Sequence, residues 1–251
     1  MQYHVRFNLS NAHELCSNGR ERLFFLSWEA DLDSFEYYCP QVLRDAFPSK
    51  EKADAYLTQT VFIPGSTQAV TATDHGDILV WDISLIVDGI AQPNERRLIK
   101  VVTFNLMNDP INILTIHNEY LVTGNKDGSI KFYDFQFKIC AWFEKLSLNE
   151  IKAISFALME PRQSDPDEDP EKAFKCADFI VADSSALVCK LESTVFEMVD
   201  SNSKKGEVIF NGLKSTINAI AVNPIKPMLA IAGKSGFIIT WNYQTKETMI
   251  N

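Results

Sequence analysis

Residues 124–128, with the sequence GNKDG, bring together the groups that a phosphate or a metal ion would bind. Glycine-rich backbone and a lysine suit a phosphate, whereas carboxylate and amide oxygens suit a divalent cation. The flanking residues are apolar and alternate with polar ones, so the cluster also fits the corner of a β-hairpin. The first interpretation leads to an enzyme or a ligand-binding protein, and the second leads to a structural protein.

A second phosphate candidate is Gly233-Lys234-Ser235, which has the residue types that end a phosphate-binding loop. That loop requires a glycine five positions earlier, where this chain has Met228. The residues that follow alternate as a strand does, so we expect no helix N-terminus to supply backbone amides to an anion. We predict a hairpin turn at this point.

The acidic run SDPDEDPE places Asp165, Asp167 and Asp169 at the first, third and fifth positions of a calcium-binding loop. Such a loop requires glycine at the sixth position and glutamate at the twelfth, but Pro170 and Cys176 stand there. Prolines in the run also prevent the helices that flank such a loop. We predict a solvated, partly disordered insertion between two strands, without a metal.

Nucleophilic catalysis requires a serine or cysteine beside a base and an orienting acid. The histidines are dispersed over three predicted units, and none has the sequence context of a catalytic base; they are His4, His13, His75 and His117. We expect His75 in a turn and His117 in the corner HNEY. The sequence therefore predicts no catalytic, cofactor-binding or metal-binding residue, and the chain is predicted not to be an enzyme.

Composition limits the compartment and the partners. The cysteines are odd in number and form no CxxC pair, which indicates free thiols in a reducing compartment; they are Cys16, Cys39, Cys140, Cys176 and Cys189. A net charge of -9 gives no basic surface for nucleic acid or anionic lipid. No run approaches the roughly 18 apolar residues of a membrane span. A soluble intracellular protein is expected, with no nucleic-acid, membrane or small-molecule partner.

The cluster at residues 124–128 belongs to a stretch that occurs four times. Each copy has a short apolar strand, a few small or polar residues and an alternating second strand; the copies are residues 67–82, 121–134, 175–192 and 227–242. Aligning them on the turn residue (Gly76, Gly128, Ser185, Gly236) places Trp81, Tyr133, Lys190 and Trp241 five positions later. The turn glycines Gly76, Gly128 and Gly236 would supply the positive φ of a tight turn. The cluster is thus predicted to be a recurring corner.

The end of the second strand is the other recurring feature. A bulky ring there would pack between sheets while the next polar residue faces the turn, a role that fits Trp81-Asp82, Tyr133-Asp134 and Trp241-Asn242. Cys189-Lys190 does not fit, so the third copy is predicted to be degenerate. Trp28 and Trp142 are also expected to be packing residues.

Further strand-like runs flank each hairpin. The predicted inner strands are residues 59–63, 111–116, 151–158 and 217–222, and the predicted outer strands are residues 98–106, 138–143 and 193–198. Residues 22–28 and 34–38 indicate two strands of another sheet, and residues 42–56 indicate a linker or a short helix. Four strands per unit, repeated with almost no helical periodicity, are typical of a β-propeller.

The predicted fold is all-β, a WD-repeat β-propeller with about four blades plus part of another. A partial blade and linker cover residues 1–56, and the blades cover residues 57–251 at approximately 57–106, 107–146, 147–211 and 212–251. WD-type repeats usually run about 40 to 45 residues and close into rings of about 4 to 8 blades. Because the units of this chain are longer than that, we expect that the ring is incomplete. The chain would then be a fragment, or another chain would complete the ring.

Three stretches resemble a family of ciliary WD-repeat proteins, the cilia- and flagella-associated subunits of the calmodulin- and spoke-associated complex. They are TVFIPGSTQAVTATDHGDILVWDI, INILTIHNEYLVTGNKDGSIKFYDFQFKICAWF and NAIAVNPIKPMLAIAGKSGFIITWNY. The resemblance extends over residues 57–243 and is most specific in the runs that end at Asp82, Asp134 and Tyr243.

The resemblance implies a non-catalytic scaffold of the axoneme near the base of the third radial spoke, where it would link spoke, doublet microtubule and dynein regulation. Its implied partners are other subunits of that complex, radial spoke proteins and the doublet microtubule. The resemblance also implies that family members are longer than this chain, with further blades and a calcium-binding-like C-terminal region. Because that region does not match these residues, the resemblance implies no calcium site here.

Two other functions remain open. One is a soluble adaptor that recognises peptides on the top face of a propeller in a signalling or ubiquitin-ligase complex. The other is an enzyme with its site in the central channel.

Overall fold

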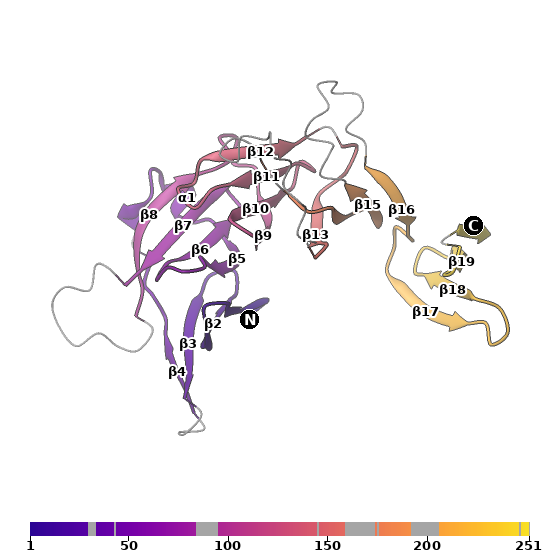
Figure 1. Cartoon of the computed structure of the whole chain (residues 1–251), viewed down its shortest axis with the longest axis horizontal. Helices are drawn as coiled ribbons and strands as arrows, with labels where there is room; N and C mark the ends of the chain where they lie inside the picture. Colours follow the sequence, from indigo (N-terminus) through magenta and orange to yellow (C-terminus); the bar gives the residue numbers. More distant parts are fainter. Residues whose placement is uncertain are drawn as a thin grey trace, which may run out of the picture. The chain divides into compact units, whose positions relative to one another are not determined.

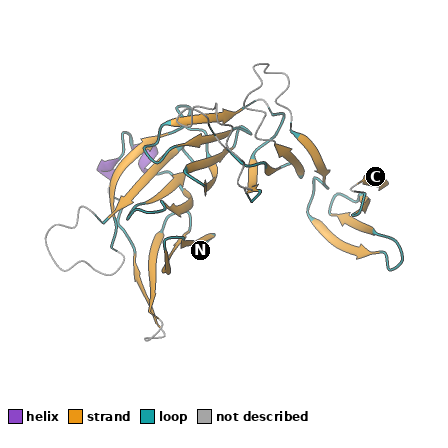
Figure 2. Ribbon diagram, viewed as in Figure 1, coloured by secondary structure: helices purple, strands orange, loops and turns teal. Residues whose placement is uncertain are grey.

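The computed structural model describes residues 1–29, 34–42, 44–83, 95–144, 146–158, 174, 176–191, 206–245 and 247–250 (Figure 1). The chain divides into two compact units, Met1–Glu144 and Lys145–Asn251. Strands and loops make up almost all of the described chain (Figure 2). The predicted all-β fold is confirmed, in the form of five four-stranded antiparallel sheets.

The first unit contains three of these sheets, and in each of them every strand pairs with the next in sequence. The first sheet comprises β1 (His4–Asn8), β2 (Asn11–Asn18), β3 (Leu23–Glu29) and β4 (Ser34–Tyr38). The second comprises β5 (Leu57–Phe62), β6 (Ala69–Thr73), β7 (Asp77–Asp82) and β8 (Arg97–Thr103). The third comprises β9 (Ile111–His117), β10 (Tyr120–Asn125), β11 (Ile130–Tyr133) and β12 (Ile139–Phe143).

The second unit contains the other two sheets, which have the same sequential pairing. One comprises β13 (Ile151–Phe156), β14 (Phe179–Asp183), β15 (Leu187–Leu191) and β16 (Glu207–Asn211). The other comprises β17 (Ile217–Val222), β18 (Met228–Gly233), β19 (Ile238–Asn242) and β20 (Glu247–Ile250).

The segment between the first two sheets contains the described helices, η1 (Arg44–Ala46) and α1 (Lys50–Ala53). The Ser49 hydroxyl accepts a hydrogen bond from the Lys52 amide at 3.3 Å and thereby caps the start of α1. A single turn of helix has little intrinsic stability, so its position depends on contacts with the sheet below.

Two predictions about the sheets need correction. Residues 1–38 form a complete four-stranded sheet rather than part of one, because β1 and β2 are strands that the polar sequence VRFNLSNAHEL does not signal. The fourth strand of the sheet that begins at β13 is Glu207–Asn211 rather than residues 193–198. Residues 193–198 and the acidic run at residues 164–171 lie outside the described residues.

The first and second sheets pack face to face in the first unit. Their shared core is formed by Cys16, Leu23 and Phe25 from the first sheet and by Leu57, Phe62, Ala69, Leu79 and Trp81 from the second. The Phe25 ring lies 6.3 Å from the Trp81 ring in an edge-to-face arrangement. Aromatic pairs of this geometry add stability beyond the burial of apolar area.

The second sheet uses its opposite face to pack against the third. Side chains alternate between the faces of a strand, so Val70, Ile78 and Val80 point away from Trp81 and toward Leu121 and Tyr133 of the third sheet. The strand β5 accordingly lies beside β1, β2 and β9. We call the face that packs on the preceding sheet the trailing face, and the face that packs on the following sheet the leading face. Trp81 and Tyr133 both lie on trailing faces.

Candidate functional site

The cluster at residues 124–128 is a turn whose polar groups bond to one another. The Gly128 amide donates to the Asn125 carbonyl at 3.2 Å, and the Ser129 amide donates to Asp127 Oδ1 at 2.8 Å. Asn125 Nδ2 donates to Ser129 Oγ at 2.9 Å, and the Lys126 amide donates to the Pro110 carbonyl at 3.0 Å. These groups form the corner itself, in agreement with the hairpin interpretation.

The same turn joins the second and third strands of four of the five sheets. Its fourth residue has a positive φ, which is 76° at Gly76, 82° at Gly128, 85° at Gly236 and 63° at Ala186. In each copy the amide of this residue donates to the carbonyl three positions earlier. The third copy therefore aligns on Ala186 and not on Ser185, as the register Ala182↔Val188 requires.

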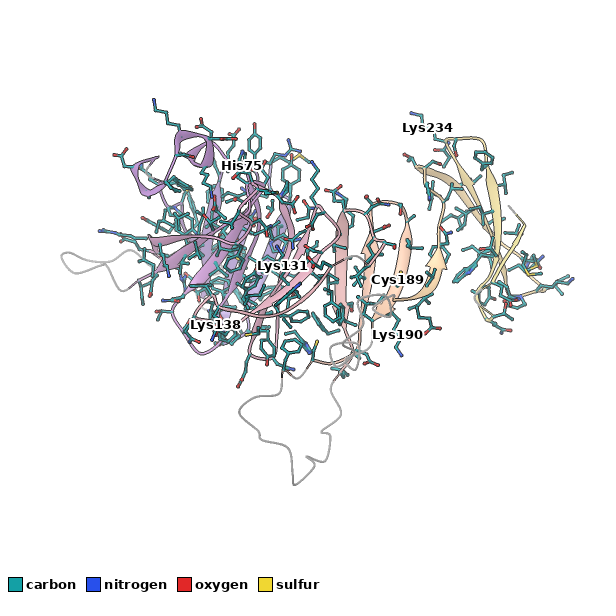
Figure 3. All side chains as sticks on the ribbon, turned by 90° about the horizontal axis from the view of Figure 1, so that it is seen from above. His75, Lys131, Lys138, Cys189, Lys190 and Lys234 are labelled. Carbon is teal, nitrogen blue, oxygen red and sulfur yellow. The ribbon has the colours of Figure 1, made fainter. Side chains whose placement is uncertain are left out.

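This shift by one residue changes the end of the third hairpin. The position equivalent to Trp81 is Leu191, which is completely buried, and not Lys190. Cys189 and Lys190 lie within β15 (Figure 3). The apparent degeneracy of the third copy came from an alignment on Ser185, because the sequence gives no sign that an alanine adopts a positive φ.

Trp81 is completely buried, and its indole nitrogen donates a hydrogen bond to Thr71 Oγ1 at 2.9 Å. The Thr71 hydroxyl also lies 2.9 Å from the hydroxyl of Thr60. Tyr133 takes the Trp81 position in the third sheet, where burial raises the pKa of its phenol and the facing Thr123 hydroxyl opposes the shift.

The polar residue after each ring stabilises a turn, which is the β5–β6 turn for Asp82 and the turn that follows the strand for Asp134 and Asn242. Asp82 accepts hydrogen bonds from Thr67 Oγ1 at 2.7 Å and from Gln68 Nε2 at 3.0 Å. Asp134 accepts from the amides of Gln136 and Lys138 at 3.0 and 2.8 Å. Asn242 accepts from the amides of Gln244 and Thr245 at 2.9 and 3.2 Å.

The other tryptophans differ from Trp81. Trp241 is half-buried, and its ring lies 5.0 Å from the ring of Phe210. Trp28 and Trp142 are exposed on β3 and β12, so the prediction that they pack in the core is wrong. Trp28 lies on the trailing face of the first sheet, and Trp142 lies on the edge strand β12 opposite Lys131. Sequence periodicity shows on which side of a strand a residue lies but not whether that position is covered.

Two buried ion pairs were missed by the sequence analysis. Arg96 pairs with Glu14 of β2, donates to the Thr67 carbonyl at 3.0 Å, and lies 4.9 Å from the Phe25 ring and 5.1 Å from the Phe62 ring. The pair joins residues 82 positions apart, so no local pattern could signal it. It fastens the first sheet to the second.

The second missed pair attaches α1 to the second sheet. Lys52 Nζ lies 2.6 Å from Asp77 Oδ1 and 2.8 Å from Thr103 Oγ1, and the Thr103 hydroxyl donates to the same carboxylate oxygen at 2.6 Å. Charges buried in this way require pairing, and here the pairing fixes the position of the helix.

The titratable groups show no activated nucleophile among the described residues. Burial raises the pKa of Cys16 and of Cys176 to about 12, and it also raises the pKa of Cys140 and of Cys189. The thiolate is the nucleophile and the metal ligand, so these four thiols stay protonated at neutral pH.

The histidines do not gather into a catalytic group in the part of the chain that the structure describes. Burial, helped by the charge of Arg6, lowers the pKa of His4 to about 4, and burial also lowers the pKa of His117. His75 Nδ1 lies 2.8 Å from Asp74 Oδ1 in the β6–β7 turn, at the end of the first unit opposite Lys138 (Figure 3). No cluster of three or more His, Cys, Asp or Glu residues suited to a metal occurs within the described ranges.

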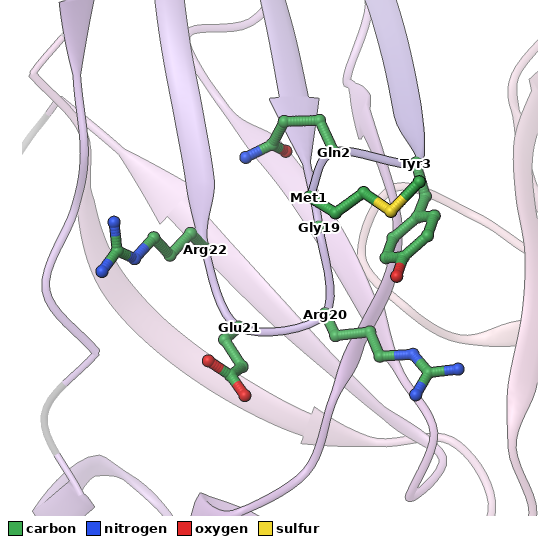
Figure 4. Close-up of a pocket in the computed structure, with 7 residues that line it drawn as sticks. All are labelled: Met1, Gln2, Tyr3, Gly19, Arg20, Glu21 and Arg22. Carbon is green, nitrogen blue, oxygen red and sulfur yellow. The ribbon is translucent and has the colours of Figure 1, made fainter.

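A hollow of about 350 Å³ lies beside the β2–β3 loop, and its walls include Tyr3, Arg20, Glu21 and Arg22 (Figure 4). The two guanidinium groups point in different directions, with Glu21 between them (Figure 4). The Arg20 guanidinium lies 6.0 Å from the ring of Tyr3. The hollow thus presents no convergent set of charges to a small anion.

Exposed apolar side chains gather on the trailing face of the first sheet. Its large side chains are between 41% and 66% exposed; they are Val5, Phe7, Trp28, Phe35 and Tyr37. Strand pairing aligns Phe7 with Leu15, Leu15 with Leu26 and Leu26 with Tyr37, which makes one continuous apolar row across the sheet. Contiguous apolar surface of this kind marks an interaction site.

The fold and its recurring turn define the class of protein: an all-β repeat protein built from similar four-stranded sheets. The family model described as the CFAP251 N-terminal domain matches residues 1–196. The chain belongs to this family, and the ciliary resemblance predicted from the sequence is confirmed.

Individual relatives carry the same name. The chain is 39% identical to cilia- and flagella-associated protein 251 of Tetrahymena thermophila, over all of this chain and 26% of that protein. It is 32% identical to the Chlamydomonas reinhardtii protein of that name, over 96% of this chain and 29% of that protein. The mouse protein is 26% identical, over 98% of this chain and 19% of its own length. The chain thus spans about a quarter of the length of the curated relatives it matches.

No helix in the described ranges is long and apolar enough to cross a membrane.

Proposed function

We propose that this chain is a non-catalytic structural scaffold of the ciliary or flagellar axoneme. The observation that carries the proposal is the family match over residues 1–196, because the relatives are named as cilia- and flagella-associated proteins. Protonated thiols and dispersed histidines in the described part of the chain agree with a role that needs no catalysis. Rigid sheets joined by independent loops suit a protein that docks several partners.

The proposal includes a WD-repeat β-propeller architecture. Its support is the recurring turn, the rings Trp81 and Tyr133 buried between sheets of the first unit, and the polar residue that follows each ring. An incomplete ring would leave a sheet face without a neighbour, and the trailing face of the first sheet carries exposed apolar side chains. Within the axoneme, the proposed position is the base of radial spoke 3, where the scaffold links spoke, doublet microtubule and dynein regulation.

The proposed partners are subunits of the calmodulin- and spoke-associated complex, radial spoke proteins and the doublet microtubule. The second candidate function is a soluble adaptor that recognises peptides. The exposed apolar side chains on the trailing face of the first sheet favour this second function, because such a surface also suits a transient partner.

Salt extraction of isolated axonemes separates these candidates. A scaffold stays on the doublets together with the spokes, because many contacts hold it, whereas an adaptor appears in the soluble fraction. A known salt-extractable axonemal protein serves as the control for extraction. Recovery of this chain with that control would contradict the scaffold, and turnover of a substrate that a histidine or acid substitution abolishes would contradict the absence of catalysis.

A further inference from the structure

One side chain holds α1 to the second sheet. Among the residues of α1, Lys52 alone bonds to a strand in the described part of the chain, and its partners are Asp77 of β7 and Thr103 of β8 (Figure 1). No residue of α1 is buried, and the element that α1 contacts most is η1. We call residues 44–56 the strap. The strap and the strands that it contacts belong to the first unit.

The strap forms one wall of a hollow. The hollow has a volume of about 340 Å³, and its other walls come from the β2–β3 loop and from strands β5–β7; its lining includes Phe47, Ala53, Tyr56, Leu57 and Leu79. Packed protein interiors leave few voids larger than a water molecule. Apolar packing therefore contributes less to holding the strap than it does to holding the sheets together.

The end of the strap that joins β5 is fixed by hydrogen bonds of the backbone. The Tyr56 amide donates to Asp74 Oδ1 at 2.8 Å, and the Asp74 amide donates to the Tyr56 carbonyl at 3.0 Å. The Leu57 amide donates to the Arg20 carbonyl at 2.7 Å. In the described residues α1 has no backbone bond to a sheet, so residues 56–57 can serve as a hinge while α1 moves.

The burial of Asp77 makes the Lys52 contact important. Asp77 is completely buried, Lys52 and Thr103 both donate to its Oδ1, and its Oδ2 has no hydrogen-bond partner among the described residues. A buried carboxylate that loses its counter-charge must regain water or another partner. Strands β6 and β8 pair with β7, whereas α1 pairs with no strand. Lifting the strap is therefore the least costly way to bring water to Asp77.

We propose that the strap opens as a unit about residues 56–57, and that the charge of Lys52 decides whether it is closed or open. A single turn of helix opens transiently, which exposes the Lys52 amine to solvent. Opening also uncovers the apolar side chains that line the hollow, such as Leu79. The proposal goes beyond the proposed scaffold function and does not depend on it.

The modification that removes this charge is acylation of the lysine amine. The ammonium group first loses a proton to water, and the neutral amine then attacks the carbonyl carbon of an acyl thioester. An N–C bond forms, the C–S bond breaks, and the thiol leaves with a second proton from the nitrogen. The amide product carries no charge, so it leaves Asp77 without its counter-charge and holds the strap open.

Hydrogen exchange of the full chain, followed by mass spectrometry, tests the proposal. The amides of Ala53, Asp54 and Ala55 report on the strap, because they donate to carbonyls of residues 49–52 in the closed form. Lys52→Gln and Lys52→Nε-acetyllysine should each raise the exchange rate of these amides by about tenfold or more, which corresponds to a latch worth at least about 1.4 kcal/mol. Exchange in β6, β7 and β8 should change much less.

Asp77→Asn removes the ion pair from the side of the sheet without leaving a buried charge, and it should speed exchange of the strap in the same way. The matched control is the same pair of changes at Lys50, which is exposed on the same turn and bonds to no strand; these variants should exchange as the unmodified chain does. Unchanged exchange of the strap in the Lys52 and Asp77 variants would overturn the proposal. Equal acceleration in the strap and in β6–β8 would also overturn it, because the whole sheet would then open. Extraction of axonemes can succeed or fail independently of these results.

Discussion

The strands β6 and β7 are buried at every residue, whereas the equivalent hairpin β18–β19 keeps Ile238 largely exposed and Trp241 half-buried. The two hairpins share a turn of five residues, and the φ of the turn glycine is similar, 76° at Gly76 and 85° at Gly236. Their difference lies in the surroundings, since the first lies between two other sheets and β17, the strand beside the second, is exposed throughout. A similar local sequence therefore gives a similar local structure, but the neighbouring sheets decide how much each residue stabilises the fold.

Trp81→Ala should have the largest effect. Removing a completely buried ring should lower the free energy of unfolding by about 3 to 5 kcal/mol, whereas Trp241→Ala should lower it by no more than about half as much. Urea denaturation followed by circular dichroism measures both. Equal losses in the two variants would show that the last sheet is as well covered as the second.

Arg96→Met should have the next largest effect. It leaves the buried Glu14 carboxylate without its main partner, which should lower the free energy of unfolding by about 3 to 5 kcal/mol. Arg97→Met is the matched control. Arg97 pairs with Glu95, but the Arg97 side chain is half exposed. The free energy of unfolding should therefore fall by less than about 1 kcal/mol. If both variants melted at the same temperature, the ion pair would not be what fastens the first sheet to the second.

The variants Gly76→Ala and Gly236→Ala should differ in stability by less than the two pairs of variants above. Both residues have positive φ, which costs an alanine about 1 to 2 kcal/mol. A Cβ at Gly76 would also come within 2.6 Å of Asn105 Cβ and 2.8 Å of the Asp109 carbonyl oxygen, whereas a Cβ at Gly236 meets nothing within 4 Å. Thermal melting should therefore show a larger shift for Gly76→Ala. The reverse order would mean that the β18–β19 turn is the more tightly packed of the two.

The hairpins and most flanking strands could be predicted because they depend on local rules. Alternation of apolar residues identified β7, β11 and β19, and the turn glycines identified the corners between strands. The rules failed where a residue departs from its usual preference, as Ala186 does with its positive φ. They also failed for β1 and β2, whose polar residues form a sheet through pairing with β3.

The candidate site could be predicted only in part. The sequence showed that the cluster at residues 124–128 is a corner, since a corner needs only neighbouring residues. It did not show that Trp28, Phe35 and Tyr37 share an exposed face, because alternation reports which residues lie on one side of a strand and not whether that side is covered.

By itself the sequence determined the strands, their turns and the membership of a ciliary family, since these follow from residue types at short spacing. Only the tertiary structure decided that Trp81 is enclosed while Trp28 is exposed, and that Arg96 meets Glu14 across 82 positions of chain. The physical reason is that a residue on the face of a sheet becomes buried only when a second sheet packs against that face. Both faces of a sheet with two apolar faces must be covered, and the sequence of that sheet does not specify what covers the second face.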